Sequence, residues 1–207
     1  MRYTFYNASF YIIGVNILLF LLTNTSPRSL AYLALNPLAV TYRNMYWQFL
    51  TYMFVHGGIS HILFNMLGLF FFGSHVERRM GSNEFLLFYL STGVLAGIFS
   101  FVVYVLTGAT NVYLLGASGA VYAVLLAYAT YYPDSTIYVM GIIPVKAPIL
   151  VLGFTGLAVF SQLFSFNNGV AHLAHLAGFG FAFLYFVVRF GINPIQAFLG
   201  GGRRRLR

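Results

Sequence analysis

Gly116-Ala117-Ser118-Gly119-Ala120 places a serine hydroxyl between glycines, where a turn-like run of residues enters a strongly apolar segment. Far downstream, Ala174-His175-Leu176-Ala177-Gly178 sets a histidine in another apolar segment. Polar side chains inside a membrane are costly and usually have a function there. A serine nucleophile paired with a histidine base would account for both residues.

The composition is that of an integral membrane protein. Of 207 residues, 60% are hydrophobic, 19% are aromatic and only 7% are charged, which no ordinary soluble domain shows. Cysteine is absent, which excludes disulfides, thiolate metal sites and a cysteine nucleophile. We find no internal repeat or second domain, so residues 1–207 are expected to form a single membrane domain with a short basic tail at 200–207.

Six apolar stretches are candidates for helices that cross a bilayer, each of which needs about 20 residues. Open strands cannot span lipid, so the expected fold is an all-α bundle of six transmembrane helices. The stretches are residues 5–23, 59–75, 84–106, 118–132, 142–164 and 169–190. Gly93-x-x-x-Gly97 and Gly153-x-x-Gly156 are small-residue faces suited to tight helix packing.

Basic residues predict the orientation of these spans. With six spans both termini lie on one side, which collects nine of the eleven Lys and Arg residues, while Arg28 and Arg43 lie on the other. The positive-inside rule therefore predicts that both termini lie in the cytoplasm, and we expect a multi-pass protein of the plasma membrane. The Arg-rich tail at 203–207 reads as a topology anchor on anionic lipid, and no nucleic-acid partner is expected.

Three polar residues share one depth in the expected bundle. Ser118, His175 and His61 each lie fourteen residues from the cytoplasmic end of their stretch, about 21 Å along a helix. Asn65 is one turn from His61, on the same helix face. The fourth stretch is too short to span the core, so it is expected to be re-entrant, with the loop at 107–113 dipping into a wet cavity.

These residues permit acyl-transfer chemistry. His175 is suited to take the proton of the Ser118 hydroxyl near neutral pH. The backbone N–H of Ser118 starts a helix, and His61 and Asn65 add side-chain donors for an oxyanion. The only acids, Glu77, Glu84 and Asp134, are expected as solvated or paired charges at the cytoplasmic edge. The chain can therefore build no more than a Ser-His dyad, with Tyr122 as the candidate that orients the imidazole by stacking.

Three linked motifs resemble the rhomboid family of intramembrane serine proteases. They are His56-x-x-x-x-His61-x-x-x-Asn65, Gly116-x-Ser118-Gly119 with Tyr122, and Ala174-His175-x-x-Gly178. The resemblance implies Ser118 as nucleophile and His175 as general base. It also implies oxyanion contacts from His61 and Asn65, and orienting roles for Tyr122, Gly116 and Gly178. No cofactor and no metal are expected.

The resemblance also implies substrates and mobile parts. Substrates would be single-pass membrane proteins, cut near the outer face of the lipid bilayer. The first loop, residues 30–54, reads as an interfacial segment, with Tyr46-Trp47-Gln48 where the family often has Trp-Arg. The loop at 165–169 is expected to be a mobile cap over the dyad.

Other readings remain open at this point. A zinc protease could be imagined from His172-x-x-His175, but the H-E-x-x-H spacing is absent. A non-catalytic rhomboid-like protein that binds membrane clients is the main alternative. A transporter is weaker, since a repeat and intramembrane charges are lacking. His56 is expected to bond loop backbone, and His172 to be a spectator facing the cavity.

Overall fold

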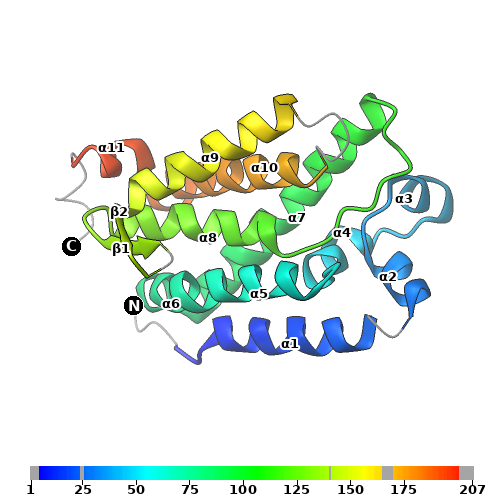
Figure 1. Cartoon of the computed structure of the whole chain (residues 1–207), viewed down its shortest axis with the longest axis horizontal. Coiled ribbons are helices and arrows are strands. Elements are labelled where there is room, and N and C mark those ends of the chain that lie inside the picture. The colour runs from blue at the N-terminus through cyan, green and yellow to red at the C-terminus, as the bar shows by residue number, and fades with distance from the viewer. Residues whose placement is uncertain (1–4, 24–25, 140, 165–169, 201–207) are drawn as a thin grey trace.

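A computed structural model describes residues 5–23, 26–139, 141–164 and 170–200, and most of them are helical (Figure 1). The long helices are α1 (Ala8–Thr23), α7 (Ser82–Leu106), α8 (Ser118–Tyr131), α9 (Ala147–Phe164) and α10 (Val170–Tyr185). One further long helix is built from α5 (Ile59–Gly68), the π-helical turn η2 (Leu69–Gly73) and α6 (Ser74–Met80). The short segments are α2 (Pro27–Leu33), α3 (Pro37–Arg43), α4 (Gln48–Thr51), η1 (Tyr52–Phe54), η3 (Phe186–Phe190) and α11 (Pro194–Phe198).

The described residues contain three helices long and apolar enough to cross a membrane, Ile59–Met80, Ser82–Leu106 and His172–Phe190. Three shorter apolar helices accompany them, Ala8–Thr23, Ser118–Tyr131 and Ala147–Phe160. The protein is thus mostly helical with several apolar helices, while the expected count of six spans stays a prediction.

Helix α8 is the centre of the bundle. Ten of its fourteen residues are buried, six of them glycine, alanine or threonine. Small side chains let neighbouring backbones come close, and α8 is packed by α10, α7, α9 and the α5–α6 helix (Figure 1). At fourteen residues it is about 21 Å long, as expected for a fourth helix shorter than a bilayer core.

The helix expected at residues 142–164 begins later than the sequence predicted. Strands β1 (Thr136–Val139) and β2 (Ile143–Lys146) form an antiparallel hairpin in which Val139 pairs with Ile143 and Thr136 with Lys146. Gly141 makes the turn at φ +76°, and Pro144 disfavours a helical conformation at the residue before it. Helix α9 therefore begins only at Ala147.

The two glycine faces differ in what they contact. A methyl group added at Gly93 would lie 2.0 Å from Met53 Cε, and one at Gly97 would lie 2.6 Å from Tyr52 Cε1. These glycines receive side chains of η1 from the first loop, so their contact is with the loop more than with another helix. No described atom lies within 4 Å of such a methyl group at Gly153 or Gly156, so tight packing was wrongly expected there.

The sequence suggested that Glu77 is a solvated or paired charge at a helix end, but the structure holds it among uncharged hydrogen-bond donors. Its side chain is fully buried, and its carboxylate accepts the N–H groups of Ala8 at 2.6 Å and Ser9 at 2.9 Å. The hydroxyls of Ser9 and Ser82 also donate to it. Glu77 therefore caps the first turn of α1 and pins that helix to the α6–α7 junction.

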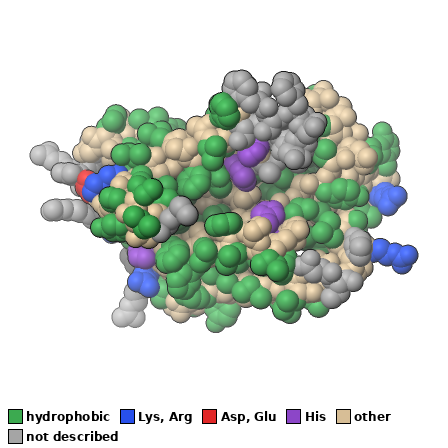
Figure 2. All heavy atoms as spheres, in the orientation of Figure 1, with side chains coloured by type: hydrophobic (Ala, Val, Ile, Leu, Met, Phe, Trp, Pro, Cys, Tyr) green, Lys and Arg blue, Asp and Glu red, His purple; other side chains and the backbone are tan. Residues whose placement is uncertain are grey.

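Charged side chains gather at the two ends of the bundle. On the face shown in Figure 2, Lys and Arg atoms lie at both ends, and the atoms not drawn in grey between them are hydrophobic, polar or histidine. One end carries β1, β2, α6 and α11, and the other carries α2 and α3 (Figure 1). This uncharged belt with charged ends is what a bilayer requires.

Candidate active site

The site is built where α8 and α10 cross. An added methyl group at Gly178 would lie 2.0 Å from the carbonyl oxygen of Gly119, and one at Gly119 would lie 3.3 Å from that of Ala174. Only glycine permits this approach. The crossing brings Ser118, which precedes Gly119, face to face with His175, which follows Ala174.

Ser118 Oγ lies 2.7 Å from His175 Nε2, within hydrogen-bond range. The ring of Tyr122, one turn along α8, stacks on the imidazole with centroids 4.2 Å apart and planes 13° apart. Tyr122 is itself held between Phe179 at 5.0 Å and Phe154 at 5.8 Å. The imidazole plane is therefore restrained by packing.

A cavity of about 550 Å³ opens beside this pair, between α5, η2, α8, α9 and α10. Ser118, His175, Tyr122, His61 and Asn65 all line it. In Figure 2 histidine side chains lie in the middle of the face, with hydrophobic surface on both sides. The structure thus places five of the seven predicted site residues around one hollow.

His61 and Asn65 lie on the α5 wall of that cavity. Asn65 Nδ2 donates to the carbonyl of His61 at 2.9 Å, which fixes the amide group on the same wall as the imidazole. Gly116, at φ +112°, passes so close that an added methyl group would lie 2.5 Å from His61 Nε2. Gly116 therefore lets the His61 ring reach the start of α8.

Helix α8 begins without a side-chain cap. Its N-cap residue, Ala117, makes no capping hydrogen bond, and the first N–H groups of any helix lack partners within it. The N–H of Ser118 is one of these groups, beside its own hydroxyl. A helix start of this kind favours developing negative charge.

No carboxylate completes the pair. The three acids of the chain are Glu77, Glu84 and Asp134, and none of them lines the cavity. His175 Nδ1 is buried, and it has no hydrogen-bond partner within the part of the chain that the structure describes. The site is a serine–histidine pair with an aromatic support.

The first loop holds the segment that leads into α8. Leu35 and Leu114 exchange two backbone hydrogen bonds of 2.9 Å, and Asn36 Nδ2 donates to Val112 O at 2.9 Å. The N–H of Gly116 donates to Tyr52 O at 2.9 Å. Ser118 is thereby positioned by residues far from it in sequence.

His56 bonds loop backbone, the role that the sequence suggested. It is fully buried, and its Nε2 accepts the N–H of Ala117 at 3.4 Å. Burial, and secondarily the nearby His61, lower the pKa of His56 to about 4. The ring is therefore neutral near pH 7, as an acceptor must be.

Two other sequence predictions fall near the site. His172 is half-buried and its ring lies 5.8 Å from that of His175, yet His172 is not among the residues that line the cavity. That His172 faces the cavity stays a prediction. The proposed cap, residues 165–169, lies outside the described residues.

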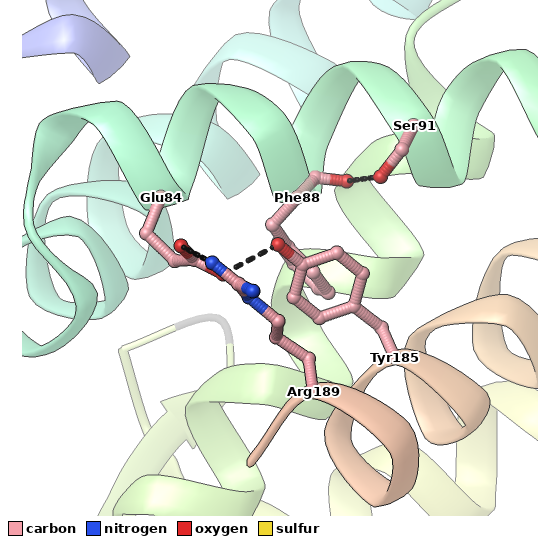
Figure 3. Close-up of polar contacts among 5 residues, drawn as sticks. All are labelled: Glu84, Phe88, Ser91, Tyr185 and Arg189. Atoms are coloured by element: carbon pink, nitrogen blue, oxygen red, sulfur yellow. Dashed lines mark hydrogen bonds and ion pairs between the residues drawn. The ribbon is translucent and has the colours of Figure 1, made fainter.

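The far end of α10 is tied to α7. Arg189 Nε lies 2.9 Å from Glu84 Oε1, and Tyr185 Oη donates to the same oxygen at 2.7 Å. Figure 3 shows both side chains reaching across to Glu84. Glu84 is thus paired, as expected, and the contact holds the end of α10 that lies opposite His175.

Gln48, Tyr52 and Met53 were missed by the sequence analysis. Gln48 is fully buried, accepts the N–H of Asn36 and donates to the carbonyls of Ala31 and Tyr32. Tyr52 Oη donates to Gly93 O at 2.7 Å. For Tyr52 and Met53 the sequence signal was the pair Gly93 and Gly97, whose lack of side chains leaves room for these two large residues.

Comparison with known proteins agrees with this geometry. Residues 43–192 match the family model of the rhomboid domain, so the chain belongs to the rhomboid family. It is 31% identical over 142 residues, 62% of its length, to RHOMBOID-like protein 12, mitochondrial, of Arabidopsis thaliana. The chain is 42% identical over 80 residues, 39% of its own length, to rhomboid protease GluP of Bacillus subtilis. It is 33% identical over 140 residues, 67% of its own length, to RHOMBOID-like protein 4 of Arabidopsis thaliana.

The chain matches only part of each of these relatives. The matches cover 42%, 15% and 32% of their respective lengths. Of these three relatives, GluP of Bacillus subtilis is named as a protease.

Proposed function

We propose that this protein is an intramembrane serine endopeptidase in which Ser118 is the nucleophile and His175 the general base. The observation that carries the proposal is the 2.7 Å contact between Ser118 Oγ and His175 Nε2, two residues that line a cavity of about 550 Å³. Its substrates would be single-pass membrane proteins, cut near the outer face of the plasma membrane.

The reaction proceeds by acyl transfer. Ser118 Oγ attacks the scissile carbonyl carbon while its proton passes to His175 Nε2. The oxyanion is held by the Ser118 N–H and by side-chain donors of His61 and Asn65. The tetrahedral species then collapses, the C–N bond breaks, and His175 returns the proton to the leaving amine. Water repeats the sequence on the Ser118 ester and releases the acid product.

Because no carboxylate supports His175, we expect a low kcat. Spoiling the role of the acid in a soluble triad lowers kcat by about 10⁴, whereas each oxyanion donor contributes about 10² to 10³. Stacking by Tyr122 keeps the imidazole in plane but supplies no charge. A slow enzyme that relies on its oxyanion donors is the consequence.

The proposed topology has six spans and cytoplasmic termini. The spans would be α1, the α5–α6 helix, α7, α8, α9 and α10, with α8 re-entrant and the first loop in the outer interface. Because the chain has no cysteine, single Thr110→Cys and Ser135→Cys variants can report sidedness with an impermeant maleimide. Labelling of Thr110→Cys alone in intact cells supports the orientation, and labelling of Ser135→Cys alone overturns it.

The function is tested by cleavage in vesicles. A fluorescent single-pass substrate is reconstituted with the protein, with Ser118→Ala and with His175→Ala, and the products are resolved by mass spectrometry. We expect cleavage by the parent protein only, unaffected by a chelator. Unchanged substrate binding and no cleavage by any of the three proteins would favour a non-catalytic client-binding protein, and loss of activity with the chelator would favour a metalloprotease.

A further inference from the structure

A second cavity is lined by residues of the first loop and its flanks and does not include the active site. It has a volume of about 620 Å³ and is formed by α2, α3 and the segment at 111–113. None of its lining residues lines the cavity that contains Ser118. It is therefore a separate hollow at the α2–α3 end of the bundle.

The lining of this second cavity is basic and rich in hydrogen-bond donors. Arg28, Arg43, Asn36 and Asn111 are among the residues that line it. Tyr32, Tyr42 and Tyr113 also line it. Apolar atoms of alanine, leucine and methionine cover the remainder.

Within the described residues, neither Arg28 nor Arg43 forms an ion pair with an acidic side chain. Glu77, Glu84 and Asp134 are the only acids in the sequence. They lie on α6, at the start of α7 and just before β1, all at the other end of the bundle (Figure 1). Two like charges in one concave site favour an anion from outside the chain, and planar guanidinium groups bind phosphate oxygens in pairs.

The surroundings of this cavity place it at a membrane interface. Tyr42 is 78% exposed, Tyr46 is 61% exposed and Tyr32 is 53% exposed, and Trp47 packs on Tyr32 with centroids 4.9 Å apart. Exposed tyrosine and tryptophan rings concentrate at the level of lipid headgroups. The anion closest to such a site is the phosphate of a lipid.

We propose that the cavity formed by Arg28, Arg43 and the residues around them binds the phosphate of a phospholipid headgroup. The lipid comes from the leaflet at the α2–α3 end, the outer leaflet in the proposed topology. Asn36 links this site to the rest of the protein, since its side chain also donates to Val112 O. A bound headgroup would therefore bridge the first loop and the segment that leads to Ser118.

The test measures binding and does not depend on catalysis. The purified protein is titrated with short-chain phosphatidylglycerol, with short-chain phosphatidylcholine and with inorganic phosphate, and bound lipid is counted by native mass spectrometry. The variant Arg28→Gln/Arg43→Gln is compared with Arg78→Gln/Arg79→Gln, which removes two exposed charges at the other end. Each basic residue near an anionic lipid contributes about fivefold, so we expect about 25-fold weaker phosphatidylglycerol binding in the first variant only.

The arms of the experiment distinguish the possible ligands. Competition by inorganic phosphate at the concentration of the lipid would identify a free-phosphate site and overturn the lipid assignment. Equal losses in both double variants would show general charge attraction and overturn the site. If Arg28→Gln/Arg43→Gln does not fold, Arg43→Lys keeps the charge but loses the paired contact. Unchanged binding by Arg43→Lys would then contradict the proposal.

Discussion

Gly178→Ala is expected to separate the serine from the histidine without touching either. The added methyl group would lie 2.0 Å from Gly119 O and 2.9 Å from Gly119 C. Both are backbone atoms of α8, so no side chain can rotate away, and the helices must move apart by about 1.4 Å to restore an ordinary contact of 3.4 Å. If the whole shift is carried to the adjacent site, the 2.7 Å contact between Ser118 and His175 lengthens to about 4.1 Å, beyond hydrogen-bond range.

The expected result is a loss of about 100-fold in kcat/KM, since a displacement of about 1 Å has effects of that size. Overpacking should also destabilise the protein by about 1–3 kcal/mol. The assay is cleavage of the vesicle substrate, with the thermal midpoint measured on the same samples.

Gly180→Ala is the matched control. It lies on the same helix, and no described atom is within 4 Å of its added methyl group. Both variants gain the same helix propensity, about 1 kcal/mol, so that gain cancels in the comparison. Activity of Gly178→Ala within threefold of Gly180→Ala would refute the account of the α8–α10 crossing.

Three further outcomes follow from the same contacts. Tyr122→Phe should keep near-parental activity, because the stacked ring is retained, whereas Tyr122→Ala should lose about tenfold in kcat with little change in KM. Glu77→Gln should lower the free energy of unfolding by about 1–3 kcal/mol, since buried donors of Ala8, Ser9 and Ser82 lose an acceptor; denaturant titration measures it. Burial lowers the pKa of His56 in the folded protein to about 4. Between pH 6.5 and pH 4 the unfolded chain therefore binds more protons at His56 than the folded protein does. The thermal midpoint should consequently fall as the pH falls through that window.

Each of these outcomes can be contradicted. Equal activity of Tyr122→Phe and Tyr122→Ala would remove stacking as the orienting force. An unchanged unfolding midpoint for Glu77→Gln would mean that the Glu77 cap of α1 contributes nothing to the free energy of unfolding. A pH profile of His56→Gln identical to that of the parent would assign the acid sensitivity to another group.

The proximity of Ser118 and His175 could be predicted from the sequence because it depends on local quantities. Helical rise and distance from the span ends place both residues at one depth, and the small residues beside each one allow close crossing. Tyr122 follows from helical periodicity, being one turn from Ser118. The roles of these residues in catalysis stay predictions.

Other features could not be predicted, because they depend on contacts between distant segments. The N–H groups that Glu77 caps are 68 and 69 residues away, and a single acid near two arginines gives no local sign of burial. Gln48 was judged against the Trp-Arg pattern of the family, although it is held by the backbone of α2 and by Asn36. The β1–β2 hairpin was missed because its short strands lie next to a long apolar run that masks their alternation.

The most direct test of the central claim is the adduct formed with a serine-directed fluorophosphonate in membranes. Peptide mass spectrometry should find the modification on Ser118 of the parent protein, and neither Ser118→Ala nor His175→Ala should be labelled. Labelling that persists in His175→Ala at the parental rate, or an adduct on another serine with Ser118 unmodified, would contradict the serine–histidine pair as the source of reactivity.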